Sequence, residues 1–180
     1  MLTRRQFLQK VSFRTGAVLI TTYPFFIERQ LVQINEYEIR LPSLPKSFHG
    51  FRIAHLTDIH HGFLTSQAFI SKITDKTNAI KHNAIVCTGD YVNAKKSQKE
   101  INEVWPILND LSAKEGVYSV LGNHDHWADG ELSLEWLEKS GQSVRHTNRA
   151  IVRGKDRIVI GGSGDLWESV GFISSRIFWS

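Results

Sequence analysis

Hydrophobic residues along the chain follow two spacings that alternate. Short apolar runs with few helix signals predict three buried strands, at residues 51–57, 84–88 and 117–121. Apolar residues that recur every three or four positions predict three helices, at residues 66–80, 101–111 and 132–137. Ser66 stands where the first helix would need an N-cap. Alternating or short apolar segments predict further strands at residues 31–40, around Val144, and at residues 151–152 and 158–160.

The order of these elements predicts the fold class. Parallel neighbouring strands need a crossover connection, and helices of this length between strands provide one. We therefore expect an α/β fold with a largely parallel sheet. The polar stretch at residues 91–100 is expected to be a surface loop that leads into the second helix.

The formal net charge of +4 comes entirely from the N-terminal segment. Residues 1–27 carry four cations and no acid, which leaves 18 of the 22 basic residues to balance all 18 acids. The rest of the chain is therefore neutral, and its composition gives no indication of nucleic-acid binding, which needs a basic face on the domain itself. Cys87 has no second cysteine with which to form an internal disulfide or a cysteine-based zinc site.

The first 27 residues have the organisation of an export signal, because a basic stretch precedes an apolar one. The string from Thr3 to Lys10, with adjacent Arg4 and Arg5, resembles the twin-arginine signal. That resemblance implies export by the twin-arginine machinery to the periplasm or to the outer face of the cell membrane or cell wall. Pro24 interrupts the short apolar stretch, so cleavage and retention at the membrane both stay open. A basic amphipathic helix packed on the domain is the alternative interpretation.

Polar residues with ligand chemistry follow each of the three predicted buried strands. Asp58 and His60 follow the first strand, Asp90 follows the second, and Asn123 follows the third. In an open α/β sheet, ligands bind at the carboxyl ends of the strands, so these residues are expected to share one pocket. Asp58 and His60 are two apart, so on an extended chain their side chains would point to the same side. A carboxylate such as Asp90 has two oxygens with which to bridge two cations.

This oxygen-rich ligand set with imidazole and without thiolate favours manganese, iron or zinc. Two such metals can clamp a phosphate and activate a water for in-line attack. Taken separately, each motif also has a structural interpretation, as surface polar residues, a turn or a helix cap. His61 and His126 are expected to be exposed neighbours of the motifs, and His146 is expected to be structural. The ordered combination of all three motifs at strand ends favours the metal site.

The three motifs together resemble those of the calcineurin-like metallophosphoesterase superfamily, in particular its exported bacterial phosphodiesterase branch. The resemblance runs over residues 30–167 and includes the string from Gly50 to Gly62. It implies that residues 28–180 are the N-terminal part of a four-layer α/β/β/α sandwich. It also implies hydrolysis of a phosphodiester or a pyrophosphate by a metal-activated water. The substrate would be a phosphate ester, which in some family members is lipid-linked or contains a nucleotide.

The resemblance also implies a role for each motif residue. Asp58 and His60 would hold the first of two divalent metals, Asp90 would bridge both, and Asn123 would hold the second. His124 would contact the phosphate and either stabilise its charge or protonate the leaving oxygen. Asp125 would orient His124, as carboxylates commonly orient imidazoles near metals.

The chain departs from the family pattern in its last part. The pattern continues with a histidine-bearing strand end and a Gly-His-x-His motif, and the sequence contains neither. From Glu168 onward the residues no longer follow the pattern. We therefore expect a phosphoesterase cut short at its C-terminus, with one metal or none held tightly and with impaired activity. The alternative is a catalytically dead exported binding protein that keeps the fold.

Overall fold

The computed structural model describes residues 31–164, and the chain divides into two units after Arg40. In the first unit, residues 31–40 form neither helix nor strand, so the strand predicted there is wrong. Tyr37 and Ile39 are 84% and 78% exposed. The alternating apolar residues of this segment therefore do not form a buried face. No strand of the described structure pairs with it. The predicted export signal at residues 1–27 and the segment from Glu168 onward lie outside the described residues.

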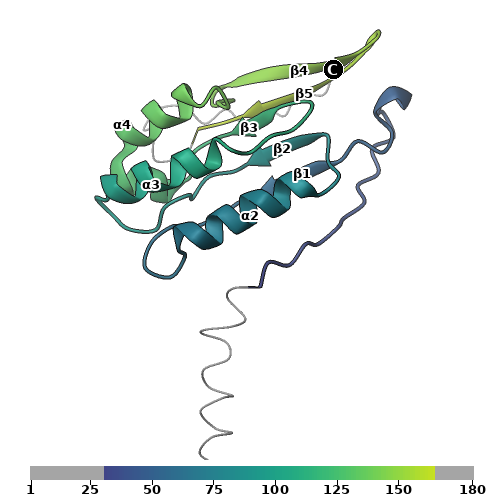
Figure 1. Ribbon diagram of the computed structural model, residues 1–180. Helices are drawn as coiled ribbons and strands as arrows, with labels where there is room; N and C mark the ends of the chain where they lie inside the picture. Colours follow the sequence, from purple (N-terminus) through teal and green to yellow (C-terminus); the bar gives the residue numbers. More distant parts are fainter. Residues whose placement is uncertain (1–30, 165–180) are drawn as a thin grey trace, which may run out of the picture. The chain divides into compact units, whose positions relative to one another are not determined.

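The second unit is built on a parallel three-stranded sheet, which confirms the predicted α/β class (Figure 1). Its strands are β1 (Ile53–Leu56), β2 (Ala84–Cys87) and β3 (Val117–Ser119), in the order β1-β2-β3. The crossovers are helices α2 (Gln67–Ala79) and α3 (Gln98–Leu108). In β1 only Ala54 is buried, so the prediction of a buried first strand is wrong in that detail. β1 lies at an edge of this sheet, where it pairs with β2 alone.

Local signals fix where the helices begin. The Ser66 hydroxyl accepts a hydrogen bond from the Phe69 amide at 3.3 Å and so caps α2 as predicted. Ser97 caps α3 in the same way. The third helix, α4 (Asn123–Lys139), begins well before the apolar positions that predicted it. Its backbone is extended at Asp129, where two helical segments meet at a kink.

The chain then forms an antiparallel hairpin of β4 (Thr147–Arg153) and β5 (Asp156–Gly162). These strands contain two of the short apolar segments that predicted strands there. Val144 lies between two isolated bridges, from Ser143 to β3 and from Arg145 to β5, rather than in a strand. A short 3-10 helix, η2 (Lys46–Phe48), precedes β1.

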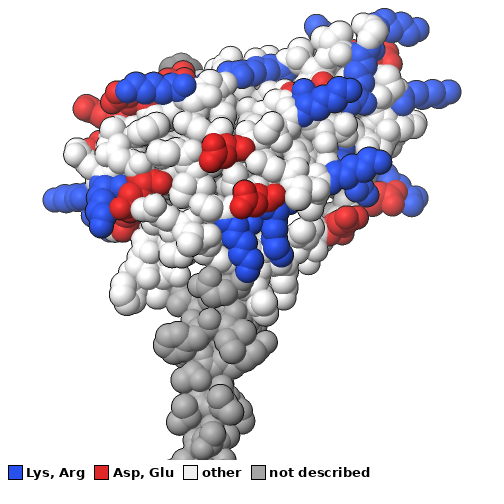
Figure 2. All heavy atoms as spheres, viewed as in Figure 1, with Lys and Arg blue, Asp and Glu red and all other residues white. Residues whose placement is uncertain are grey.

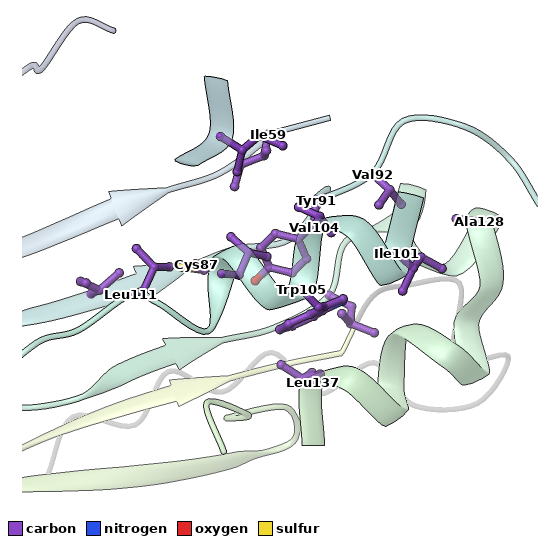
Figure 3. Packing of buried hydrophobic residues seen from close by; sticks show 14 of the residues in the cluster. Ile59, Cys87, Tyr91, Val92, Ile101, Val104, Trp105, Leu111, Ala128 and Leu137 are labelled. Carbon is purple, nitrogen blue, oxygen red and sulfur yellow. The ribbon is translucent and has the colours of Figure 1, made fainter. Parts of the chain in front are cut away.

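The alternating side chains of β2 place it between two hydrophobic clusters, because successive residues in a strand face opposite sides. Ile85 and Cys87 join the larger cluster, which packs against α2, α3 and α4 and includes the fully buried Trp105 (Figure 3). Ala84 joins the smaller cluster, which contains Phe48 of η2 and Ile151 of β4. The described residues thus form helices, a parallel sheet and a hairpin layer, in agreement with the metallophosphoesterase fold.

Basic and acidic side chains are interspersed over much of the face in Figure 2. Among residues 31–164, no helix combines the length and the apolar character that crossing a membrane requires.

Candidate metal centre

Backbone hydrogen bonds carry the pairing of β1 and β2 past the ends of both strands. The amide of Asp58 donates to the carbonyl of Gly89 at 3.2 Å, and the amide of His60 donates to the carbonyl of Asp90 at 2.9 Å. The two motifs that follow these strands therefore lie side by side. The third motif begins α4, and the amide of His124 donates to Oδ1 of Asp90 at 2.9 Å.

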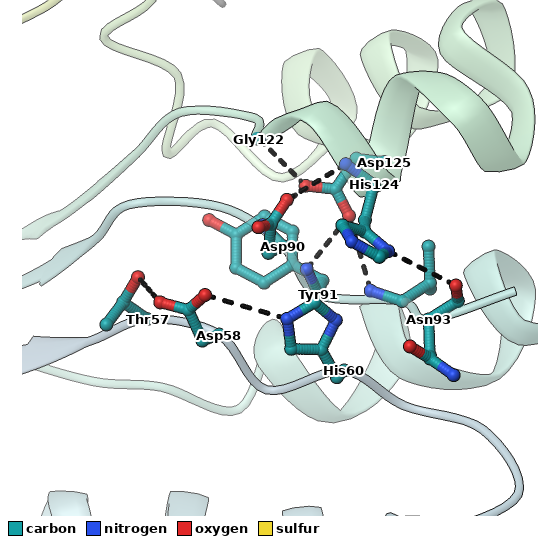
Figure 4. Close-up of polar contacts among 10 residues, drawn as sticks. Thr57, Asp58, His60, Asp90, Tyr91, Asn93, Gly122, His124 and Asp125 are labelled. Atoms are coloured by element: carbon teal, nitrogen blue, oxygen red, sulfur yellow. Dashed lines mark hydrogen bonds and ion pairs between the residues drawn. The ribbon is translucent and has the colours of Figure 1, made fainter.

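These bonds bring three side chains from three separate segments together. His60, Asp90 and His124 each offer a ligand atom, and these atoms all lie within 4.8 Å of one another. The imidazole rings of His60 and His124 meet edge to face, with centroids 4.5 Å apart. Nε2 of His60 also lies 3.5 Å from Oδ1 of Asp58, as Figure 4 shows. The segments after the three strands thus bring His60, Asp90 and His124 together, with Asp58 beside His60, and the sharing of one site by Asp58, His60, Asp90 and Asn123 stays a prediction.

The cluster has the chemistry of a cation site. Two carboxylates and two imidazoles provide oxygen and nitrogen ligands of the kind that manganese, iron and zinc accept. The buried Nδ1 of His60 has no hydrogen-bond partner in the described structure, and Asp58 is exposed enough to be reached by solvent. The residues present therefore fit a divalent ion, which the family resemblance implies. The metal-ligand roles of Asp58, His60, Asp90 and Asn123 stay predictions.

The expected reason for the approach of Asp58 and His60 is wrong. Both residues have left-handed backbone conformations, with φ of 54° and 47°, instead of the extended chain that would place them on one side. Asp90 is also left-handed, with φ of 56°. Such conformations are uncommon for residues other than glycine and cluster at functional sites. Tight turns that follow the strands, held by the hydrogen bonds to the β2 segment, bring the side chains together.

Asp125 holds the second and third motifs together. Its buried carboxylate accepts hydrogen bonds from the amides of Asp90, Tyr91 and Gly122, each at 2.9 Å, and from the amide of Val92 at 3.3 Å. Burial raises the pKa of this carboxyl to about 7, while the bonds from its neighbouring amides act in the opposite direction. The carboxylate thereby ties the loop of Asp90 to the start of α4.

These contacts differ from the role that the resemblance implied for Asp125. Within residues 31–164, its carboxylate accepts hydrogen bonds from backbone amides, and none joins it to the His124 ring. Nδ1 of His124 instead donates to the carbonyl of Asn93 at 3.2 Å. Asp125 still positions His124 indirectly, because both belong to the first turn of α4.

Two glycines allow the motifs to approach. A Cβ at Gly89, where φ is 93°, would overlap the backbone nitrogen of Gly122. A Cβ at Gly122 would in turn overlap Oδ1 of Asp90. The half-buried Asn123 follows directly as the first residue of α4.

His61 was expected to be an exposed neighbour, and that prediction is wrong. Its side chain is buried, with Nδ1 2.9 Å from the carbonyl of Thr65 and Nε2 3.1 Å from Oε2 of Glu103. This pair anchors the segment after His60 to α3. Glu103 was missed because it follows no motif and stands beside the apolar stripe of a helix. His126 is half-buried in α4, and His146 lies in the turn before β4.

Comparison with known proteins agrees with this geometry. Residues 51–178 match the model of the calcineurin-like phosphoesterase family. The metallophosphoesterase YkuE of Bacillus subtilis is 27% identical over 152 residues, which cover 82% of this chain and 53% of YkuE. The UDP-2,3-diacylglucosamine pyrophosphatase LpxG of Chlamydia muridarum is 31% identical over 109 residues, which cover 61% of this chain and 33% of LpxG.

A third relative, a transmembrane protein with a metallophosphoesterase domain from Danio rerio, is 27% identical over 165 residues. That match covers 89% of this chain and 37% of the fish protein. The chain thus spans about half or less of the length of these relatives. No solved structure matches it significantly.

Proposed function

This chain belongs to the calcineurin-like phosphoesterase family, and we propose that it hydrolyses phosphate esters at the cluster of His60, Asp90 and His124. The observation that carries the proposal is that these side chains, from segments following three different strands, offer ligand atoms within 4.8 Å of one another. A divalent ion bound there would supply Lewis acidity and an activated water.

We assign a role to each side chain of the site from its position. Asp58, His60 and Asp90 would hold one ion, and Asp90 with Asn123 would face a second. His124 is half-buried, and its Nδ1 is engaged by the carbonyl of Asn93, so Nε2 is the nitrogen available to the substrate. We assign to this nitrogen a hydrogen bond to the phosphate and the proton that the leaving oxygen needs. Because Nδ1 keeps the proton that it donates to Asn93, the ring would give the proton from Nε2 as an imidazolium and become neutral.

We further propose that metal is held incompletely by these 180 residues. The ligands assigned to the second ion are Asp90 and Asn123, and two side chains are few for tight binding of a divalent ion. We expect less than two metal ions per chain and weak turnover. A protein that binds its ligand without turning it over is the competing function that the same ligand set favours.

The test combines metal content with turnover. The full chain is equilibrated with Mn²⁺, freed of unbound metal and assayed for metal by mass spectrometry and for hydrolysis of bis(p-nitrophenyl) phosphate. Asp90→Ala should lose both metal and turnover, because it removes the carboxylate shared by the two positions. Asp75→Ala, which removes an exposed carboxylate of α2, is the matched control and should behave as the wild type.

Each outcome decides between the proposals. Turnover that survives Asp90→Ala would refute the assignment of the site. Two tightly bound ions with full turnover would refute the incomplete metal site. Metal bound without turnover would favour the binding protein.

The substrate class and the location are also proposals. The name of the chlamydial relative, a UDP-2,3-diacylglucosamine pyrophosphatase, supports a phosphate ester with a nucleotide or a lipid as the substrate here. We propose export through residues 1–27 on the twin-arginine pattern in the sequence, with membrane association through the same segment. Replacing Arg4 and Arg5 by lysine should abolish appearance of the protein outside the cytoplasm. Unchanged export would refute that proposal.

A further inference from the structure

The loop of residues 93–96, which follows the Asp90 motif, is fastened to α4 beside the metal centre. The carbonyl of Asn93 accepts from Nδ1 of His124 at 3.2 Å, and the amide of Lys96 donates to the carbonyl of Trp127 at 3.0 Å. The amide of Ala94 donates to Oε2 of Glu100 at 3.1 Å. Because the amides of Ala94 and Lys96 are both hydrogen-bonded, the backbone position of Lys95 between them is fixed.

Lys95 points onto an aromatic ring that itself contacts the metal centre. Its Nζ lies 4.7 Å from the centroid of the Trp127 ring, and the Trp127 and His124 rings have centroids 4.8 Å apart. Only these two contacts separate the ammonium from the His124 imidazole. A cation is thus placed one side chain beyond the cluster of His60, Asp90 and His124.

The charge of Lys95 is held but not neutralised. Within residues 31–164, Lys95 makes no ion pair with a carboxylate, whereas nearby Lys99 lies 3.8 Å from Oε1 of Glu103. A cation–π contact orients an ammonium without cancelling its charge. Lys95 can therefore also attract an anion that occupies the adjoining site.

Trp127 itself is poorly placed as a stacking platform for a nucleobase. Lys95 lies over its ring, and the His124 ring approaches it at an interplanar angle of 50°. The indole is thus occupied by its two neighbours, which favours a role in holding the cation.

We propose that Lys95, held by Trp127, binds a second anionic group of the substrate when its first phosphate lies at the metal centre. This makes Lys95 a specificity-determining residue and makes the preferred substrate a compound with two adjacent anionic groups, such as a diphosphate diester. The inference rests on the proposed function, because it needs a phosphate at the metal centre.

The test uses binding, so that it does not depend on turnover. The full chain with Mn²⁺ is titrated calorimetrically with inorganic phosphate and with methylenediphosphonate, which carries two adjacent anionic groups and is not hydrolysed. The wild type should bind the diphosphonate about tenfold more tightly than phosphate, the gain that one added charge contact can give. Lys95→Gln should remove that preference without changing the phosphate affinity, and Lys95→Arg should largely keep it.

Lys96→Gln is the matched control, since it removes the same charge from the next residue of the loop and should leave both affinities as in the wild type. Chelation of Mn²⁺ by the diphosphonate is the same for every variant, so it cancels when the diphosphonate affinity of each variant is compared with that of the wild type. An unchanged preference in Lys95→Gln would overturn the inference, as would an equal loss with Lys96→Gln, which would indicate only a diffuse charge effect.

The two proposals fail in different ways. If phosphate binding needs Mn²⁺ and is lost with Asp90→Ala while Lys95 has no effect, the metal site stands and the inference alone is overturned. If neither anion binds in a way that depends on Mn²⁺ and Asp90, the proposed function fails and the inference fails with it.

Discussion

Replacing Asp125 by asparagine tests how the two motif segments are held together. At pH 8, above the pKa of about 7, the carboxylate is ionised and accepts from four amides, two at each oxygen. An asparagine side chain has a single oxygen, which can accept from one pair of these amides. Its NH₂ group then faces the other pair, and two N–H donors cannot bond to each other. Two buried amides then lose their acceptor, at about 1–3 kcal/mol each, while relief of a buried charge offsets part of the loss.

We therefore expect Asp125→Asn to lower the free energy of unfolding by about 2–4 kcal/mol, measured by urea denaturation at pH 8. The affinity for Mn²⁺ should fall as well, because the loop of Asp90 loses its attachment to α4. The matched control is Asp129→Asn. The Asp129 carboxylate also accepts from a backbone amide, that of Leu132 at 3.1 Å, but its position is half-buried. Asparagine caps a helix as well as aspartate does, so this variant should keep the stability of the wild type.

The reasoning would be refuted if Asp125→Asn stayed within about 0.5 kcal/mol of the wild type, the range of ordinary surface substitutions. It would also be refuted if Asp129→Asn destabilised the protein equally, because the effect would then not depend on the buried amides.

Three further outcomes follow from the structure. Gly89→Ala should destabilise the fold by much more than Gly141→Ala, for which about 1 kcal/mol is expected. Both glycines have positive φ, 93° and 69°, but a Cβ at Gly141 has open space around it, whereas one at Gly89 overlaps the backbone of Gly122. Thermal unfolding of the two variants measures the difference. Burial raises the pKa of the Cys87 thiol to about 12, so Ellman's reagent at pH 8 should label it only after denaturation; rapid labelling of the native protein would contradict its burial. The hydrogen bond from His61 lowers the pKa of Glu103 below its ordinary value of 4.5, so this carboxylate stabilises the fold above that pH and loses its contribution as the pH falls through the folded-state pKa. Glu103→Gln should therefore flatten the acid limb of the stability profile, and an unchanged limb would mean that the pair contributes nothing.

The sequence predicted those parts of the fold in which local pattern and tertiary packing agree. The spacing of Ile101, Val104 and Leu108 marked the buried face of α3, and Ser66 marked the start of α2. The same reasoning failed at residues 31–40, where alternation does not correspond to burial. Periodicity records which residues could share a face, but pairing with a neighbour decides whether a strand forms.

His60, Asp90 and His124 are residues that the sequence motifs singled out, but the geometry of their cluster could not be predicted. Parallel strands bring their carboxyl ends to one edge, so the meeting of His60 and Asp90 follows from topology. The left-handed turns at both residues and the amide contacts of Asp125 depend on how distant loops pack. Glu103 and Lys95 act through such packing too, and no spacing in the sequence relates them to the motifs.

The crossover topology has a consequence for how this centre comes into being. A helix and a strand separate His60 from Asp90, and another helix and strand separate Asp90 from His124. Bringing these three residues together in the unfolded chain therefore costs loop-closure entropy before any sheet contact repays it. The site can therefore bind metal only after β1, β2 and β3 have paired. A fragment that ends before α4 would also lack His124. Added Mn²⁺ should accordingly slow unfolding more than it speeds folding.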